Sequence, residues 1–227
     1  MYLVKKRICH TENKKLHDLN ISIHTFGNVS IRLNKELFII KPSGINLNKV
    51  QPNKYPVVNI KTNKVISGTL KPSVDSDIHK QIYKYDNNIK SIAHSHSLFA
   101  TSFAQANLQI PVLGTTHADY FPSKILITKK LSKKEVSNNY ELNIGNSIIE
   151  ALKINKVNAK SSRAILINNH GSFTWGYSNE EAVINMEALE YIAKLAYYTL
   201  NLKHRPKIER FLINKDYLRK HGNKSYY

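Results

Sequence analysis

The stretch Ser91-Ile92-Ala93-His94-Ser95-His96-Ser97 decides both the predicted fold and the predicted site of this sequence. Its apolar beginning is typical of a buried strand, and side chains alternate between the two faces of a strand. We therefore expect His94 and His96 to project from the same face toward one point. Two neutral imidazoles in that position form half of a site for zinc or a similar divalent cation.

Two other stretches supply further candidate ligands. Residues 164–171 form a second apolar run that ends in His170 and a glycine, and residues 72–75 place Asp75 before a predicted helix. Three histidines and a carboxylate suit zinc, although a His-x-His pair taken alone is more often structural. His79 and His117 are additional candidates, and we expect His79 to be structural or to support the ligands.

Composition favours a globular chain with one α/β domain. The sequence has 227 residues, of which 41% are hydrophobic and 22% charged, enough for a substantial core. No apolar run has the length of a membrane span, and the N-terminus is charged before a signal sequence could form. Cys9 is the single cysteine, which excludes an intrachain disulfide. We expect a cytoplasmic protein without a membrane partner.

The net charge of +18 raises the question of nucleic-acid binding. The lysines are scattered along the chain, and no basic run with interleaved aromatic residues or compact DNA-binding motif accompanies them. We expect no nucleic-acid partner. A basic nucleic-acid-binding protein stays as the alternative from another functional class, and it predicts a contiguous basic face and steep salt dependence.

Hydrophobic periodicity predicts helices around a central, mostly antiparallel sheet, in a single domain over residues 1–227. Helices are expected over 2–20, 75–85, 101–106, 143–152 and 178–200, and strands over 29–33, 36–40, 56–60, 64–66, 91–96 and 164–168. Ser178 and Glu181 have the spacing of a capping box for the last helix. Residues 114–120 are expected to form a polar loop.

Short loops that combine glycine with small polar residues are candidate phosphate sites: Gly27-Asn28, Ser43-Gly44 and Ser73-Val74. Glycine lets an anion approach the backbone, and N–H groups with hydroxyls can surround a phosphate. No nucleotide-binding fingerprint is present, so a phosphate would belong to a small metabolite. Ordinary turns are the alternative for each loop. Asp119 suits either general acid/base catalysis or capping of the next element.

Seven motifs occur along the chain in one order: 26–30 (FGNVS), 41–44 (KPSG), 71–75 (KPSVD), 94–97 (HSHS), 114–120 (GTTHADY), 170–173 (HGSF) and 218–222 (LRKHG) followed by Tyr226-Tyr227. This order resembles the L-ribulose-5-phosphate 4-epimerases of the class II aldolase/epimerase superfamily. The resemblance covers nearly the whole chain, and the joint order is far more specific than any single motif.

The resemblance implies a class II aldolase-like α/β/α fold, a C4 homotetramer with active sites at subunit interfaces, and Zn²⁺ or another divalent metal such as Mn²⁺. It implies interconversion of L-ribulose 5-phosphate and D-xylulose 5-phosphate in pentose catabolism, with the arabinose and ascorbate routes both open. The implied metal ligands are Asp75, His94, His96 and His170. The implied phosphate and substrate residues are Gly27, Asn28, Ser43, Gly44, Ser73, Val74 and Arg219. Asp119 and Tyr227 are the implied acid/base pair, and the tail 216–227 reaches a neighbouring subunit's site.

The chemistry of the implied reaction agrees with these assignments. The C4–H of a ketose phosphate is not acidic, so cleavage and re-formation of the C3–C4 bond is a sensible route to inversion. A divalent cation would act as a Lewis acid toward the charge left by cleavage. Two acid/base groups are needed because the C4 oxygen points oppositely in the two isomers, and Asp119 and Tyr227 would serve them.

Two positions depart from the family pattern. Val74 stands where a second serine is common, and Asp216 stands where a histidine is frequent. Both departures concern phosphate contacts more than the reaction. The nearest rival is a class II aldolase of the L-fuculose-1-phosphate type, in which a glutamate tends to act as base; the shorter Asp75 suits a ligand role and favours the epimerase. A non-catalytic homologue is a further alternative, opposed by the intact candidate ligands.

Overall fold

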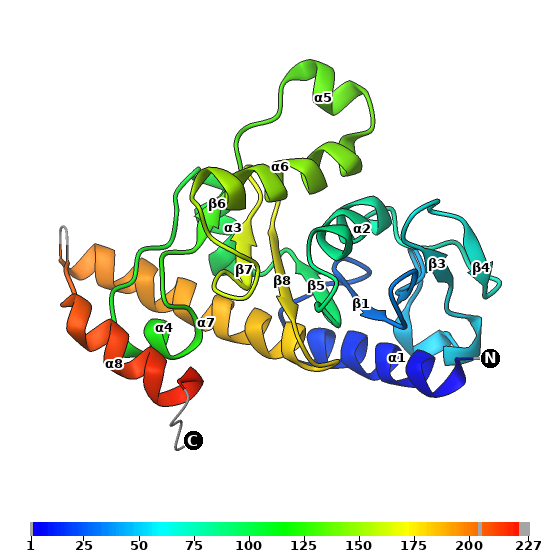
Figure 1. Cartoon of the computed structure of the whole chain (residues 1–227), viewed down its shortest axis with the longest axis horizontal. Helices are drawn as coiled ribbons and strands as arrows, with labels where there is room; N and C mark the ends of the chain where they lie inside the picture. The colour runs from blue at the N-terminus through cyan, green and yellow to red at the C-terminus, as the bar shows by residue number, and fades with distance from the viewer. Residues whose placement is uncertain (1, 204–205, 223–227) are drawn as a thin grey trace.

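The computed structural model describes residues 2–203 and 206–222. Its strands are β1 (Asn28–Arg32), β2 (Leu37–Ile40), β3 (Val57–Asn59), β4 (Val65–Ser67), β5 (Ser91–Ser95), β6 (Leu126–Ile127), β7 (Ala164–Leu166) and β8 (Ser172–Gly176). They form one sheet in the order β4-β3-β2-β1-β5-β8-β7-β6 (Figure 1). Among the strands of the described residues only the β6–β7 pair is parallel, so the prediction of a mostly antiparallel sheet is confirmed.

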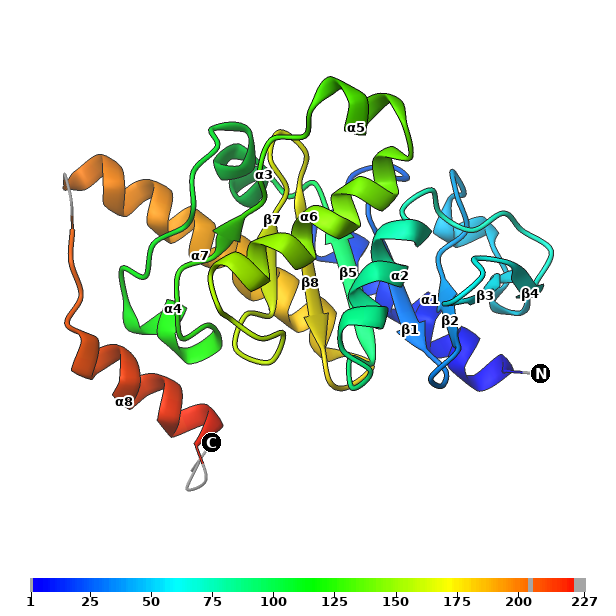
Figure 2. The same cartoon turned by 45° about the horizontal axis from the view of Figure 1, so that its top comes forward.

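Helices cover both faces of this sheet. They are α1 (Leu3–Asp18), α2 (Ser76–Tyr85), α3 (Leu98–Gln105), α4 (Thr115–Tyr120), α5 (Lys133–Ser137), α6 (Tyr140–Ile154), α7 (Glu181–Leu202) and α8 (Arg210–His221). Helices α1, α3 and α7 cover one face, and α2 and α6 cover the other (Figure 2). Two short 3-10 turns, Leu47–Lys49 and Pro52–Lys54, precede β3. The result is the α/β/α arrangement that the resemblance implies.

Alternating side chains of the strands build two separate cores. Ile39 and Ala93 belong to the core under α1 and α7, whereas Ile40 and Ile92 belong to the core under α2 and α6. Because side chains alternate along a strand, His94 lies on the same face as Ile92. Burial of both faces removes large apolar area from water, at roughly 25 cal/mol per Å², and thereby holds β5 between its two neighbours.

Strand register fixes which residues meet at the end of β5. The antiparallel pairing of β1 with β5 places Asn28 opposite His94. The pairing of β5 with β8 places Phe173 opposite His94 and Ser172 opposite Ser95. A shift by one residue would move each of these side chains to the other face, so the register determines what surrounds His94.

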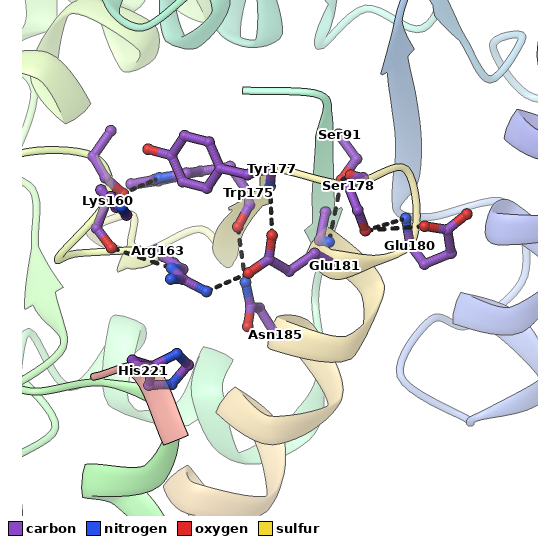
Figure 3. A network of polar contacts seen from close by, with 12 residues as sticks. Ser91, Lys160, Arg163, Trp175, Tyr177, Ser178, Glu180, Glu181, Asn185 and His221 are labelled. Carbon is purple, nitrogen blue, oxygen red and sulfur yellow. Dashed lines mark hydrogen bonds and ion pairs between the residues drawn. The ribbon is translucent and has the colours of Figure 1, made fainter. Parts of the chain in front are cut away.

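Two local predictions are wrong. Residues 115–120 form helix α4 instead of a loop, since His117 and Ala118 are buried and α4 packs against α7 and α8. The predicted capping box is absent, because α7 begins at Glu181 without a side-chain cap. The Glu181 carboxylate accepts a hydrogen bond from the Tyr177 N–H (2.5 Å) and pairs with Arg163 (Figure 3).

Other helices differ from their predicted extents. Helix α3 begins at Leu98, three residues before the predicted start, and α6 begins at Tyr140, also three residues earlier. The basic tail forms α8 up to His221, which periodicity did not predict. Among the described residues, no helix combines the length and apolar character needed to cross a membrane.

Candidate active site

Three histidines converge at the end of β5. His94 Nε2 lies 3.1 Å from His96 Nε2 and 3.3 Å from His170 Nε2, and the three potential ligand atoms all lie within 4.8 Å of one another. His94 comes from β5, His96 follows it directly, and His170 lies in the turn between β7 and β8. The convergence expected from the sequence is therefore present for all three imidazoles.

The spacing of these nitrogen atoms suits a tetrahedral metal ion. Zinc–nitrogen bonds of about 2.0–2.1 Å at tetrahedral angles separate the ligand atoms by about 3.3–3.4 Å. The separations of His94 Nε2 from His96 Nε2 and from His170 Nε2, 3.1 and 3.3 Å, are close to that value, and the whole group spans no more than 4.8 Å. Three imidazole nitrogens that converge in this way form a donor set that fits a divalent cation.

Surrounding groups fix the orientation of the rings. His94 Nδ1 lies 2.9 Å from the Ser172 carbonyl oxygen, which only accepts, so Nδ1 carries the proton and Nε2 keeps its lone pair. The Phe173 ring stacks on His94 with centroids 4.3 Å apart, and Phe26 stacks on His96 at 5.7 Å. A Cβ on Gly171 would come within 2.6 Å of the Ser95 carbonyl oxygen. Glycine there lets the turn approach β5.

Burial keeps two of these histidines neutral. Burial and the charge of the neighbouring His94 together lower the pKa of His96 to about 4, against the opposing effect of Asp75. Burial and the charges of His94 and His96 lower the pKa of His170 to about 3. Unprotonated imidazoles are the form that binds metal, so His96 and His170 have the required protonation state near neutral pH.

Asp75 lies beside the histidines without belonging to the group within 4.8 Å. Its Oδ2 accepts hydrogen bonds from Asn28 Nδ2 (2.6 Å) and Ser73 Oγ (3.2 Å). Burial raises the pKa of its carboxyl, but the charges of His94 and His79 and the Asn28 bond outweigh burial and lower the pKa overall. The carboxylate is therefore ionised, and its role as fourth ligand stays a prediction.

The three predicted substrate loops lie together. Asn28 Nδ2 donates to Ser73 Oγ (3.2 Å), and the loops at 41–44 and 71–75 are joined by an isolated bridge between Pro42 and Pro72. The Ser43 N–H donates to the Lys71 carbonyl oxygen, and the Ser73 N–H donates to that of Lys41. The loop backbones are thus held in place by each other, beside the histidines.

The glycines of these loops meet different surroundings. Gly27 has φ +71°, and a Cβ there would lie 2.8 Å from the His94 carbonyl oxygen. Gly44 has φ +63°, and a Cβ there would have no neighbour within 4 Å. Gly27 is therefore required for packing, whereas the space beside Gly44 is open to a ligand. Val74, which departs from the family pattern, is 65% exposed.

Lys41 is a nearby cation to which the sequence reading gave no role of its own. Its Nζ donates to the Thr25 carbonyl oxygen (2.7 Å), and its side chain is buried. Burial lowers the pKa of Lys41, and Asp75 opposes that shift. The sequence feature that could have indicated a role for Lys41 is its position as the first residue of the KPSG motif, residues 41–44. A buried ammonium beside small hydroxyl loops suits an anion.

Asp119 lies in another part of the molecule. It belongs to α4, which packs against α8 and α7 away from β5 (Figures 1 and 2). Arg219 Nη2 donates to both oxygens of the Asp119 carboxylate, at 2.9 and 3.1 Å. Asp216 lies 3.6 Å from the same guanidinium, and His221 Nε2 lies 2.8 Å from the Asp119 carbonyl oxygen. Within one chain, neither Asp119 nor Arg219 joins the histidines.

The remaining candidates have structural surroundings. His79 is fully buried, and its Nδ1 lies 2.7 Å from Ser30 Oγ. His117 Nε2 donates to the Ser123 carbonyl oxygen (3.0 Å) in the interior beside α4. Neither belongs to the histidine group. Tyr227 lies outside the described residues. Sequence reasoning missed Tyr140, whose hydroxyl lies 3.3 Å from His170 Nδ1.

Sequence comparison links the chain to a known family. The family model described as Class II Aldolase and Adducin N-terminal domain matches residues 7–197. A protein of Mycoplasma pneumoniae named probable L-ribulose-5-phosphate 4-epimerase UlaF is 43% identical over 227 residues. That match covers 99% of this chain and 93% of the relative.

Solved structures share the fold at low sequence identity. An L-fuculose 1-phosphate aldolase superposes with a TM-score of 0.78 and 22% identity, covering 94% of each chain. The L-fuculose 1-phosphate aldolase of Glaciozyma antarctica gives a TM-score of 0.75 at 17% identity, over 93% of this chain and 79% of that one. YgbL of Escherichia coli, described as a putative aldolase/epimerase/decarboxylase, gives 0.72 at 21% identity, over 95% and 98%. These structures establish the fold.

Proposed function

This chain belongs to the class II aldolase family, and we propose that within it the chain is a metal-dependent epimerase that interconverts L-ribulose 5-phosphate and D-xylulose 5-phosphate. The convergence of His94, His96 and His170 at metal-ligand spacing carries the proposal. The extensive identity to a protein named as a probable 4-epimerase supports the choice of substrate.

The three histidines, with Asp75 as fourth ligand, would hold the divalent cation, Zn²⁺ or Mn²⁺. When bound, such a cation supplies positive charge that stabilises the oxyanions developing as a carbon–carbon bond beside a carbonyl breaks. Asn28 would orient the Asp75 carboxylate, because its side-chain amide donates a hydrogen bond to that carboxylate. The aromatic rings of Phe26 and Phe173 limit the movement of His96 and His94.

The clustered loops would bind the substrate phosphate. Glycine at position 44 leaves open space above the backbone, and Ser43 and Ser73 supply hydroxyls. Lys41 adds a positive charge close to these loops. Holding the phosphate keeps the two-carbon aldehyde fragment in the site while its carbonyl turns, and retention of that fragment distinguishes an epimerase from an aldolase.

Asp119 and Tyr227 would move the protons. One of them removes the C4 hydroxyl proton as the C3–C4 bond breaks, and its electron pair stays with the three-carbon fragment. After the aldehyde turns, the C3–C4 bond forms on the opposite face, and the other group donates a proton to the new C4 oxygen. The two isomers present this oxygen in opposite directions, so each direction of reaction uses the pair in reverse order.

We also propose that Asp119 acts in the site of a second copy, in a homotetramer with sites at its subunit interfaces. Helix α4, which carries Asp119, lies away from β5 of the same chain (Figures 1 and 2), so a complete site would need another chain. Helix α7 has an exposed apolar stripe at heptad spacing that suits contact with a further helix: Ile184, Tyr191, Leu195, Tyr198 and Leu202. A ring in which each copy completes its neighbour's site fits these features.

A product assay tests the reaction. Purified protein with zinc or manganese should convert L-ribulose 5-phosphate into D-xylulose 5-phosphate, followed by a coupled assay or by NMR. Metal-stripped protein should be inactive and should recover when metal is restored. Accumulation of free glycolaldehyde phosphate and dihydroxyacetone would instead identify an aldolase, and no conversion of the metal-loaded protein would contradict the proposal.

A subunit-mixing assay tests the shared site. Copies carrying His96→Asn and copies carrying Asp119→Asn should each be inactive alone. Refolding them together at equal concentrations should restore about one quarter of the parent activity, because about one interface in four combines two intact partners. Mixed protein that assembles and stays inactive would show that Asp119 acts within its own chain, and Asp119→Asn copies that are active alone would show that Asp119 has no catalytic role.

A further inference from the structure

Tyr140 contacts the side of the His170 ring that faces away from the histidine group. The Tyr140 hydroxyl oxygen lies 3.3 Å from His170 Nδ1, while His170 Nε2 lies 3.3 Å from His94 Nε2. A neutral imidazole carries one proton, on either nitrogen. The group beside Nδ1 therefore influences whether Nε2 can offer a lone pair to a cation.

His94 provides the comparison for this contact. The Ser172 carbonyl oxygen beside His94 Nδ1 only accepts hydrogen bonds, so it selects the tautomer with a free Nε2. A tyrosine hydroxyl can donate or accept a hydrogen bond. When His170 Nε2 keeps its lone pair for a cation, the proton is on Nδ1, and the Tyr140 oxygen 3.3 Å away can accept it. Side-chain partners of this kind orient ligating histidines and raise their basicity.

Both partners of this contact are held by the fold. Tyr140 is the first residue of α6, and the Asn143 amide donates to the Asn138 (2.6 Å) and Glu135 (2.9 Å) carbonyl oxygens just before it. The turn that carries His170 is closed by the Ile167 N–H donating to the Gly171 carbonyl oxygen at 2.8 Å. The hydroxyl and the imidazole thus meet through two well-connected backbone segments.

We propose that Tyr140 is a positioning residue, whose hydroxyl oxygen accepts the His170 Nδ1–H and so directs the Nε2 lone pair toward the metal. This inference rests on the metal centre of the proposed function and adds to it a residue that no motif indicated. Tyr140 would act through His170, because its hydroxyl lies beside Nδ1 and not beside the Nε2 that would bind the cation.

The test compares Tyr140→Phe with Tyr177→Phe as a matched control. Both variants lose one phenolic oxygen; that of Tyr177 donates to Asp86 Oδ2 (2.8 Å), and Tyr177 belongs to the network around Glu181 and Arg163 (Figure 3). Zinc affinity is measured by competition with a chromophoric chelator. Solvent exchange of the His170 Nδ1–H in the zinc-loaded protein is measured by NMR.

Tyr140→Phe should bind zinc about 10-fold more weakly than the parent, and its His170 Nδ1–H should exchange faster with solvent. Tyr177→Phe should match the parent in both measurements. Equal affinity and equal exchange in Tyr140→Phe would overturn the inference while leaving the metal centre intact. A parent protein that binds no divalent metal would overturn the metal centre and the inference together.

Discussion

The histidine end and the Asp119 end of this molecule are built in different ways. His94 comes from the central strand β5, where the Ser172 carbonyl oxygen and the Phe173 ring of β8 hold it. His96 follows β5 directly, and the Phe26 ring, just before β1, stacks on it. Asp119 comes from the six-residue helix α4, held by α7 and by its ion pair with Arg219 of α8. The first end is fixed by the sheet, and the second depends on a few side-chain contacts.

This difference separates two tasks of the proposed enzyme. A cation needs ligand atoms placed within a few tenths of an ångström, which a sheet interior with dense packing provides. A proton-transfer group has to meet a substrate that enters and leaves, and in this chain it lies where helices pack. We expect substitutions at the two ends to separate metal binding from proton transfer.

The largest effect is expected from His96→Asn. Loss of one of three converging nitrogen atoms should weaken zinc binding by more than the roughly 10–100-fold typical of losing a supporting partner, and epimerase activity should fall to background. The measurements are bound metal by elemental analysis and turnover of L-ribulose 5-phosphate. His17→Asn, at an exposed position on α1, is the matched control and should keep both. A His96→Asn variant with parental metal content would remove His96 from the centre.

The next effect is expected from Asp119→Asn. Loss of one acid/base group should lower kcat by about 10²–10⁴-fold, while zinc affinity stays at the parental value because Asp119 is not one of the proposed metal ligands. Steady-state kinetics and chelator competition provide these two measurements. Reduced zinc affinity in this variant would contradict the separation of the two ends.

Asp119→Asn also breaks the ion pair with Arg219, so it needs a control. Arg219→Met removes the same pair and keeps the carboxylate. Partly exposed pairs contribute about 0–1 kcal/mol, so this variant should stay folded. If Arg219→Met loses as much kcat as Asp119→Asn, with unchanged KM, then the placement of α8 and not proton transfer accounts for the loss.

The smallest effect is expected from lowering the pH, which should reduce folding stability through one buried histidine near each end, His79 and His117. Burial lowers the pKa of His79, behind the histidine group, to about 3 and that of His117, in α4, to about 4. Their unfolded pKa is about 6.5, so the unfolded chain binds these protons first. Stability is therefore complete above pH 6.5 and lost as pH falls toward 4, at about 1.4 kcal/mol per pH unit for each group.

Denaturant unfolding at several pH values measures this loss, which should reach about 2 kcal/mol per histidine at pH 5. His117→Gln keeps a donor for the Ser123 carbonyl oxygen without titrating in this range. Between pH 6.5 and 5 the free energy of unfolding of this variant should fall less steeply with pH than that of the parent, by the slope that corresponds to about one bound proton. An unchanged slope would show that His117 is already exposed to protons in the folded state.

The sequence-based predictions were most accurate where the alternation of side chains along a strand is enough to place a residue. His94 and His96 share a face because of the period of a strand, and β7 brings His170 to them. Prediction failed where tertiary contacts overrode local pattern. Residues 115–120 are of types common in loops, but they form a helix that packs against α7 and α8. Glu181 does not form the predicted capping box, because its carboxylate pairs with Arg163 and accepts a hydrogen bond from the Tyr177 N–H.

Contacts between segments that lie far apart in the sequence cannot be predicted from local spacing. Nothing near Tyr140 in the sequence indicates that α6 begins beside His170, and the pairing of Asp119 with Arg219 joins residues that lie 100 positions apart. The resemblance assigned these two to different tasks, whereas folding brings them together. Contacts of this kind arise from helix packing, which no local spacing encodes.

In the proposed metalloenzyme, the pairing of β1 with β5 would also make metal uptake a check on correct folding. A chain paired one residue out of step would present the imidazoles to the wrong core and could not chelate a cation. Ligand binding stabilises only the state that binds, by RT ln(1 + [L]/Kd). The proposed cation would therefore favour the correctly aligned sheet over its misaligned competitors, and the yield of correctly folded protein would then depend on the supply of metal.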